Sequence, residues 1–462
     1  MNWYSNRGEK GLILLIRDRG FYRSFFSLTL IIALQNLIAF GVNLADNMML
    51  GTYSEVAMSG AAMANQIQFL LQQLAGGIGA GAVVIAAQYW GKQQTRPMRR
   101  VFSVTLWFGL LVSVAMGIAA FFAPQGLLSL LTNEPQVIDQ GAQYMKIMAV
   151  SYPIFMVTQL LFAFLRSAET VRIGFWVSLS TLFVNIGLNY TLIYGHFGFP
   201  EMGARGAAIA TLIARVMELL IVLLYARFLD KKLNLRLRHF ARVERTYLRD
   251  YFKTGLPLML SSLSWGIAMS LQSAILGRLG GSAIAANAIA ATLFQVIAVV
   301  AYASASASGV LVGKAVGTGD IPRVKQMSKT LQLLFVGIGI FSGAALFLAR
   351  GGIVSIYRAA PETDALARQL IAVLCVTVIF TSYQMATLTG IVSGGGDTKF
   401  VLFNDLIFMW GIVLPISALS AFVFHWPIPV TFICLKADQV LKCFVAVVKV
   451  NRFRWIRVLT RD

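Results

Sequence analysis

Long apolar runs, separated by short polar or charged stretches, dominate the chain. A helix needs about 20 consecutive apolar residues to cross the hydrocarbon core of a bilayer. Several of the runs exceed 25 residues, so tilts or kinks are expected. The predicted transmembrane helices are the twelve segments 25–50, 58–88, 101–123, 141–165, 173–194, 206–228, 254–277, 283–313, 330–349, 369–392, 400–424 and 429–448. The preceding segment, 11–24, is expected to form a short amphipathic helix on the inner membrane surface.

Composition excludes a soluble protein of this length. Of the 462 residues, 58% are hydrophobic and only 13% are charged, and the mean hydropathy is +0.73. Soluble domains carry about 25% charged residues, and half that share does not cover a folded surface. The sequence therefore predicts an integral membrane protein surrounded by lipid.

The net charge of +20 is distributed asymmetrically between the two sides of the predicted membrane. If both termini are cytoplasmic, the inner segments hold 30 of the 39 Lys and Arg residues and the outer segments hold six. Positively charged loops remain on the cytoplasmic side of membrane proteins. The basic pI of about 10.2 is therefore interpreted as a topology signal and not as a sign of nucleic-acid binding. We predict a multi-pass protein of the cytoplasmic membrane with both termini inside.

The two halves of the chain resemble each other. A shift of 226 positions aligns Leu50 with Leu276, Gly51 with Gly277 and Gly91 with Gly317, and it preserves a stripe of small residues. Because each half has six spans, the two copies would have the same orientation, an arrangement found in transporters. The expected parts are an N-terminal segment (1–24), a first lobe (25–228), a basic linker (229–253), a second lobe (254–448) and a tail (449–462).

Polar residues inside the first-lobe spans are few and lie in the outer half. Asp46, Asn185, Asn189 and Thr211 all fall at this depth, where an ionisable group is costly and usually functional. A carboxylate with amide and hydroxyl oxygens could hold Na⁺, because hard cations prefer oxygen ligands. It could also be a protonatable carboxyl with hydrogen-bond partners. A third interpretation is a satisfied polar cluster that joins helices.

The second lobe holds a different set of polar residues, interpreted either as a self-neutralised cluster or as a substrate or proton site. Its charged members are Asp405, Lys436, Asp438 and Lys442, which are expected to compensate one another. Trp265, Gln272 and Gln384 are further candidates for lining a cleft. In the first lobe, Arg215 and Glu218 are three residues apart, a spacing that predicts a structural ion pair.

No enzymatic, metal or cofactor chemistry is indicated. The cysteines (Cys375, Cys434 and Cys443) lie in apolar runs without ligand spacing, and the three histidines are far apart. No Walker-type phosphate-binding loop and no soluble catalytic module interrupts the spans. We predict no catalytic residues and no cofactor, with an ion gradient as the energy source.

Several segments resemble those of the multidrug and toxic compound extrusion (MATE) family. They are NLADNMMLG, the glycine-rich run ending in YWGK, LRSAETVR, NIGLNYTLIYG followed by FGFPEMGARGAAIAT, and GGGDTKF. The resemblance covers essentially the whole chain. It implies two pseudo-symmetric six-helix lobes that form a V-shaped cleft and export amphipathic, often cationic, compounds in exchange for H⁺ or Na⁺.

The same resemblance implies roles for individual residues. Asp46 matches the acidic residue on which ion coupling depends, and Asn185 and Thr211 match its neighbours. Asn189 departs from the pattern, because many members have Asp there, and this leaves the choice between H⁺ and Na⁺ open. Trp265 stands about where some members have Glu, so a second-lobe cation site of that kind is not expected.

The leading functional hypothesis is a monomeric secondary-active exporter of amphipathic drugs or metabolites. The alternative within the same superfamily is a lipid-linked oligosaccharide flippase, which would favour a cation-rich cavity for pyrophosphate. Here the intramembrane cations are only Arg215, Lys436 and Lys442, each with an acidic neighbour. A membrane-embedded transferase is a third alternative, but the longest loops lack paired carboxylates.

Overall fold

A computed structural model describes residues 15–235, 243–356 and 360–461, and the regular structure in these ranges is helical. The first half contains α1 (Arg19–Tyr53), α2 (Glu55–Gly91), α3 (Thr95–Phe122), α4 (Pro124–Leu128), α5 (Pro135–Ser167), α6 (Arg172–Tyr194), η1 (His196–Gly198), α7 (Gly203–Leu224) and η2 (Tyr225–Leu229). The second half contains α8 (Arg245–Gly277), α9 (Gly281–Thr318), α10 (Ile321–Ile356), α11 (Pro361–Met385), η4 (Ala386–Val392), α12 (Thr398–Asp405), η5 (Leu406–Val413), α13 (Leu414–Phe422) and α14 (Ile428–Asn451).

Each predicted transmembrane segment corresponds to a helix, or to consecutive helices, in the structure. Within the described residues, eleven helices are long and apolar enough to cross a membrane. The twelfth, α14, has 24 residues and carries the charged side chains of Lys436, Asp438 and Lys442. The chain is thus an all-helical, multi-pass membrane protein. Most helices extend past the apolar runs because their backbone hydrogen bonds continue into the polar flanks; α8, for example, begins at Arg245 and not at 254.

The prediction of a separate amphipathic helix over 11–24 is wrong where the structure describes it. Residues 15–18 are not helical, and α1 begins at Arg19. The Asp18 side chain accepts a hydrogen bond from the Gly20 backbone N–H and caps the helix in the usual way. Residues 19–24 are therefore the first turns of the spanning helix. Residues 11–14 lie outside the described residues.

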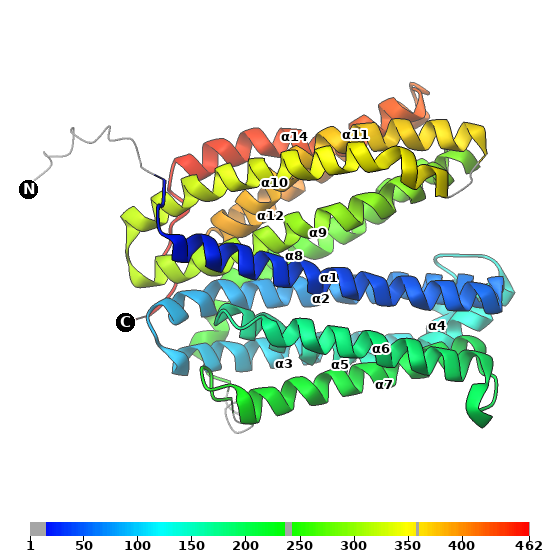
Figure 1. The fold of residues 1–462 in the computed structure, drawn as a ribbon, viewed down its shortest axis with the longest axis horizontal. Coiled ribbons are helices and arrows are strands. Elements are labelled where there is room, and N and C mark those ends of the chain that lie inside the picture. The colour runs from blue at the N-terminus through cyan, green and yellow to red at the C-terminus, as the bar shows by residue number, and fades with distance from the viewer. Residues whose placement is uncertain (1–14, 236–242, 357–359, 462) are drawn as a thin grey trace, which may run out of the picture.

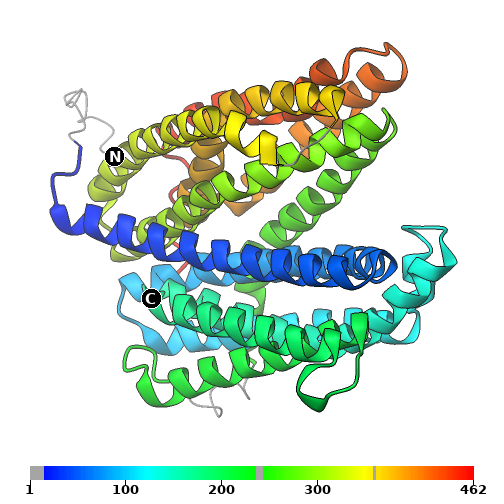
Figure 2. The same cartoon turned by 45° about the vertical axis from the view of Figure 1, so that its right-hand side comes forward.

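The helices form two groups that diverge from a common end (Figures 1 and 2). Helices α1 to α7 make the first lobe and α8 to α14 the second. The described ends of the chain lie on one side of the molecule, here called the termini end, where the lobes meet. The opposite side is called the far end. Between the lobes runs α1, whose first half contributes Phe25 and Ile32 to the core of the second lobe. In its second half, Asp46 and Met49 accept hydrogen bonds from α6.

Small residues allow the lobes to touch. A side chain at Gly81 of α2 would collide with the backbone of Gly255 in α8, and one at Gly317 of α9 would collide with the Gln88 carbonyl of α2. Gly91 meets the Lys314 backbone in the same way. Gly91 and Gly317 are the two glycines that the internal repeat aligns. The close approach of α2 and α9 at the termini end therefore uses equivalent positions of both lobes.

Polar contacts reinforce this seam. The Lys314 ammonium of α9 lies 2.8 Å from the carboxylate of Glu169, just after α5. The Arg166 guanidinium of α5 donates a hydrogen bond to the Ser306 hydroxyl of α9 at 2.8 Å. The termini end is thus closed by direct bonds between the lobes.

Candidate functional site

The structure brings the four polar residues of the first lobe into one buried cluster. Asp46 comes from the far half of α1, Asn185 and Asn189 from one face of α6, and Thr211 from α7. The Asn189 amide donates to the Asp46 carboxylate and to the Asn185 amide oxygen at 3.1 Å. Asn185 in turn donates to the Thr211 hydroxyl at 3.4 Å. Asp46 is 7% exposed, and both asparagines are fully buried.

The cluster is rich in oxygen acceptors and contains one carboxylate. The Asn189 amide oxygen is buried and has no hydrogen-bond partner among the described residues. Buried polar atoms are normally paired, so this oxygen and the Asp46 carboxylate together suit a proton or a small monovalent cation. The described residues contain no group of three or more His, Cys, Asp and Glu side chains that could hold a metal ion. One carboxylate with neutral oxygens matches a singly charged ligand better than a divalent metal.

The charge of Arg215 reaches Asp46 without an ion pair at contact distance, a link between Arg215 and this cluster that the sequence interpretation missed. Its guanidinium donates to the Ser151 hydroxyl at 2.6 Å and to the Gln68 amide oxygen at 3.3 Å, and it lies over the ring of Phe155. The predicted ion pair between Arg215 and Glu218 does not form at contact distance, because the Arg215 guanidinium bonds to side chains of α2 and α5 instead. The sequence feature that could have linked Arg215 to the cluster is its position four residues after Thr211, on the same face of α7.

In the second lobe, Lys442 is held between two carboxylates. Its ammonium lies 2.8 Å from an oxygen of Asp405 and 3.6 Å from one of Asp438. Asp405 also accepts a hydrogen bond from Ser261 of α8. The Gln439 amide donates to Asp438 at 2.7 Å and accepts from Gln384 of α11 at 2.8 Å. A continuous network thus joins α8, α11, α12 and α14, with Ser261 and Gln439 as members that the sequence did not single out.

Lys436 forms no ion pair at contact distance with these carboxylates, and its charge acts on Asp438 only at longer range. The predicted four-residue compensation is therefore direct for Lys442 and indirect for Lys436. Its ammonium donates to the Gln272 amide oxygen at 3.3 Å and lies near the rings of Phe294 and Phe432. Gln272 also approaches the Met409 sulfur at 3.4 Å. Positions 436 and 438 are two apart, and side chains two apart on a helix point in different directions.

Trp265 makes an edge-to-face contact with Tyr302, with ring centroids 6.4 Å apart. It also packs against a small apolar cluster of the second lobe. It is therefore part of the helix packing between α8 and α9, and the described contacts do not join it to the charged network.

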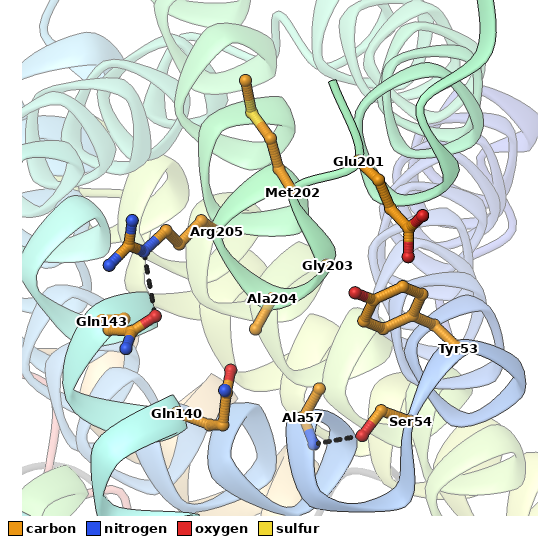
Figure 3. A pocket seen from close by; sticks show the side chains of 10 residues that line it. All are labelled: Tyr53, Ser54, Ala57, Gln140, Gln143, Glu201, Met202, Gly203, Ala204 and Arg205. Atoms are coloured by element: carbon orange, nitrogen blue, oxygen red, sulfur yellow. Dashed lines mark hydrogen bonds between the residues drawn. The ribbon is translucent and has the colours of Figure 1, made fainter. Parts of the chain in front are cut away.

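A polar recess opens at the far end of the first lobe (Figure 3). Its volume is about 560 Å³. The Glu201 carboxylate points toward Tyr53, and Arg205 donates to Gln143 at 2.9 Å. Tyr53 lies about two helical turns beyond Asp46 on α1, so the recess and the Asp46 cluster are separate features.

Comparison with known proteins agrees with this architecture. A family model described as MatE matches residues 32–191 and 257–419, one segment in each lobe. The chain belongs to the MatE family. The first matched segment contains Asp46, Asn185 and Asn189, and the second contains Asp405.

Curated relatives of this MATE chain cover most of its length. A probable multidrug resistance protein NorM of Photorhabdus laumondii is 27% identical over 402 residues, 86% of each chain. Another, of Thermotoga maritima, is 24% identical over 434 residues, covering 93% of this chain and 92% of the relative. The uncharacterized transporter YisQ of Bacillus subtilis is 23% identical over 420 residues, 90% and 91% of the two chains.

Solved structures show the same fold. A mutant of the Vibrio cholerae MATE transporter VcmN matches with a TM-score of 0.85 at 15% identity, covering 95% of this chain and 98% of the other. A MOP superfamily transporter from Pyrococcus furiosus matches with a TM-score of 0.84 at 18% identity, covering 95% of this chain and 97% of the other. The predicted MATE architecture of two six-helix lobes is thereby confirmed.

Proposed function

We propose that this MATE transporter is a secondary-active antiporter that exports amphipathic, cationic drugs or metabolites in exchange for H⁺ or Na⁺. The observation that carries the proposal is the state of Asp46. Its buried carboxylate is held by a neutral amide, and in the described part of the chain no ion pair reaches it. A charge at this depth is costly unless something neutralises it, and an exchangeable ion meets that need.

Ion binding at Asp46 changes the charge of the cluster by one. A bound ion shifts a conformational equilibrium only if it binds one state better than the other. Helix α1 links the site to such an equilibrium, since it carries Asp46 in the first lobe and packs Phe25 and Ile32 into the second. A change in the hydrogen bonds of Asp46 would therefore alter the packing of α1 at the boundary between the lobes. This is the route by which an entering ion would favour one opening of the V.

The substrate class rests on the relatives and on composition. Two of the relatives described above are probable multidrug resistance proteins. Apolar side chains dominate the chain, which has 17 Met and 32 Phe residues. Flexible Met-rich and aromatic surfaces suit binding of varied amphipathic compounds.

The test is export of a fluorescent cationic dye from proteoliposomes under either a pH gradient or a Na⁺ gradient. We expect one of the two gradients to drive export by the native protein and Asp46→Asn to abolish it. The matched control is Asp139→Asn, which removes an exposed carboxylate of the same lobe and should leave export unchanged. Full gradient-driven export by Asp46→Asn would refute the assignment.

We further propose that the transporter is a monomer in the cytoplasmic membrane and that its termini end faces the cytoplasm. The 30-to-6 distribution of Lys and Arg between the two sides supports this orientation. A cysteine placed at Pro200 should react with an impermeant reagent added outside, whereas one at Thr95 should react only after permeabilisation. External labelling at position 95 would overturn the orientation.

A further inference from the structure

The segment after α14 has a structural role that the exchange reaction does not explain. Beyond Asn451 the chain leaves the helix. It then crosses from the second lobe to the first at the termini end, as the red trace in Figure 1 shows. Residues 456–461 of this segment, here called the strap, are not helical.

The base of the strap is fixed to the second lobe. Trp455 is fully buried, and its indole N–H donates to the Val450 carbonyl at 2.8 Å. A side chain at Gly395 would collide with its ring. The Arg457 backbone N–H donates to the Gly395 carbonyl at 2.8 Å, and the Arg457 guanidinium lies 3.2 Å from the Asp397 carboxylate.

The other half of the strap is held by the first lobe through Gln88 of α2. The Gln88 amide nitrogen donates to the Arg457 carbonyl at 3.1 Å. Its amide oxygen accepts from the Leu459 backbone N–H at 2.7 Å. One side chain thus pairs with a carbonyl and an N–H two residues apart, as a neighbouring β-strand would. Leu459 also packs against the core of the first lobe.

The tip of the strap is bound by charge and by a hydroxyl. The Arg461 backbone N–H donates to the Tyr89 hydroxyl at 3.2 Å. The Arg461 guanidinium makes two bonds with the Asp250 carboxylate of α8, at 2.7 and 2.9 Å. The docking site therefore combines α2 with the start of α8, the part of this second-lobe helix that packs into the core of the first lobe through Tyr251.

The attachments of the strap to the two lobes are close together along the chain. Arg457 bonds to the second lobe and Leu459 to the first, and two extended residues span at most about 7 Å. Gln88 itself lies at the contact of α2 with Gly317 of α9. Separation of the lobes at this end must therefore pull the strap off one of its anchors.

We propose that Gln88, Tyr89 and Asp250 form a peptide-binding site whose ligand is the strap of this same chain, and that the bound strap latches the termini end closed. Release of the strap is coupled to opening. Gln88 is fully buried in the closed state, so loss of the strap alone would leave its amide unpaired, which is unfavourable. Opening of the seam would return that amide to water.

The test measures the distance between spin labels across the seam. Labels on cysteines at the exposed positions Gln93 and Thr318, with the three native cysteines replaced by serine, report the separation of the lobes in lipid nanodiscs. Leu459→Pro removes the N–H that Gln88 binds. We expect the ratio of long to short distances to rise about five-fold or more, the effect of one lost buried hydrogen bond with its partner left unpaired.

Val458→Pro is the matched control. Val458 is 54% exposed, and its N–H makes no hydrogen bond with the described residues. This variant should keep the native distances. Unchanged distances in Leu459→Pro, or an equal rise in both proline variants, would overturn the latch.

A charge swap provides a second test if Leu459→Pro fails to fold. Asp250→Arg should raise the population of long distances, because it places two cations together at the tip of the strap. Combining it with Arg461→Asp should restore the native distribution. If the double variant behaves like Asp250→Arg alone, the strap does not act through this site and the proposal fails.

Discussion

Asp46 in the first lobe and Asp438 in the second are both buried carboxylates, 7% and 1% exposed, but they are neutralised differently. Asp46 is held by the neutral amide of Asn189. Asp438 receives the Gln439 amide at 2.7 Å and lies 3.6 Å from the Lys442 ammonium. A carboxylate with a lysine at contact distance is suited to holding helices together. Asp46 has no such contact, because the nearby Arg215 bonds to Gln68 and Ser151, and this leaves its oxygens available to an exchangeable ion.

The internal repeat sharpens this contrast. The shift of 226 positions places Gln272 where the first lobe has Asp46. Gln272 accepts a hydrogen bond from Lys436 at 3.3 Å. At this position the second lobe therefore has a neutral side chain bonded to a cation of the protein itself. At this pair of equivalent positions, the first copy has a carboxylate and the second has an amide.

The largest effect is expected for Lys442→Met, which leaves Asp405 and Asp438 without their common counter-charge. Removal of one partner from a buried ion pair costs about 3 to 5 kcal/mol, so the variant should show a clearly lower midpoint of thermal unfolding in detergent. Lys442→Met combined with Asp405→Asn should be less destabilised, because one carboxylate has lost its charge. Equal loss in the single and double variants would show that the network is not coupled.

A smaller effect is expected for Asn189→Ala, which removes the amide that donates to Asp46. Hydrogen bonds to charged groups contribute about 1.5 to 3 kcal/mol, so gradient-driven dye export should fall about ten- to hundred-fold. The control is Thr191→Ala on the same helix, since the Thr191 hydroxyl is exposed and bonds to its own helix at Gly187. Native export by Asn189→Ala would mean that Asp46 functions without its amide partner.

The smallest effect is expected for Lys436→Met. Lys436 bonds to a neutral amide and to aromatic rings, and Lys442 remains the contact partner of Asp438 when Lys436 is lost, so the cost should be about 1 kcal/mol. Unfolding of Lys436→Met and Lys442→Met in the same detergent compares the two lysines of α14 directly. A loss as large as that of Lys442→Met would place Lys436 in the charged network after all.

The sequence was most informative about properties that depend only on the position of a residue along its helix. Span positions followed from apolar length, and the common depth of Asp46, Asn185 and Thr211 followed from their distance to the span ends. Arg215 shows the limit: its spacing from Glu218 allowed an ion pair, but its guanidinium bonds to Ser151 of α5. The competing partners lie on other helices, and local spacing contains no information about them.

The strap shows the same limit more strongly. In the sequence, residues 452–461 are a short basic tail, and nothing there marks Gln88 as its partner 371 residues away from Leu459. The sequence alone determined that twelve helices cross the membrane and that Asp46 lies at depth in the first lobe. The tertiary structure decided that Lys442, and not Lys436, meets the carboxylates, and that the tail binds across the seam. The physical reason is that hydropathy fixes how far a residue lies along a helix, whereas its partners depend on how that helix is rotated and packed against the others.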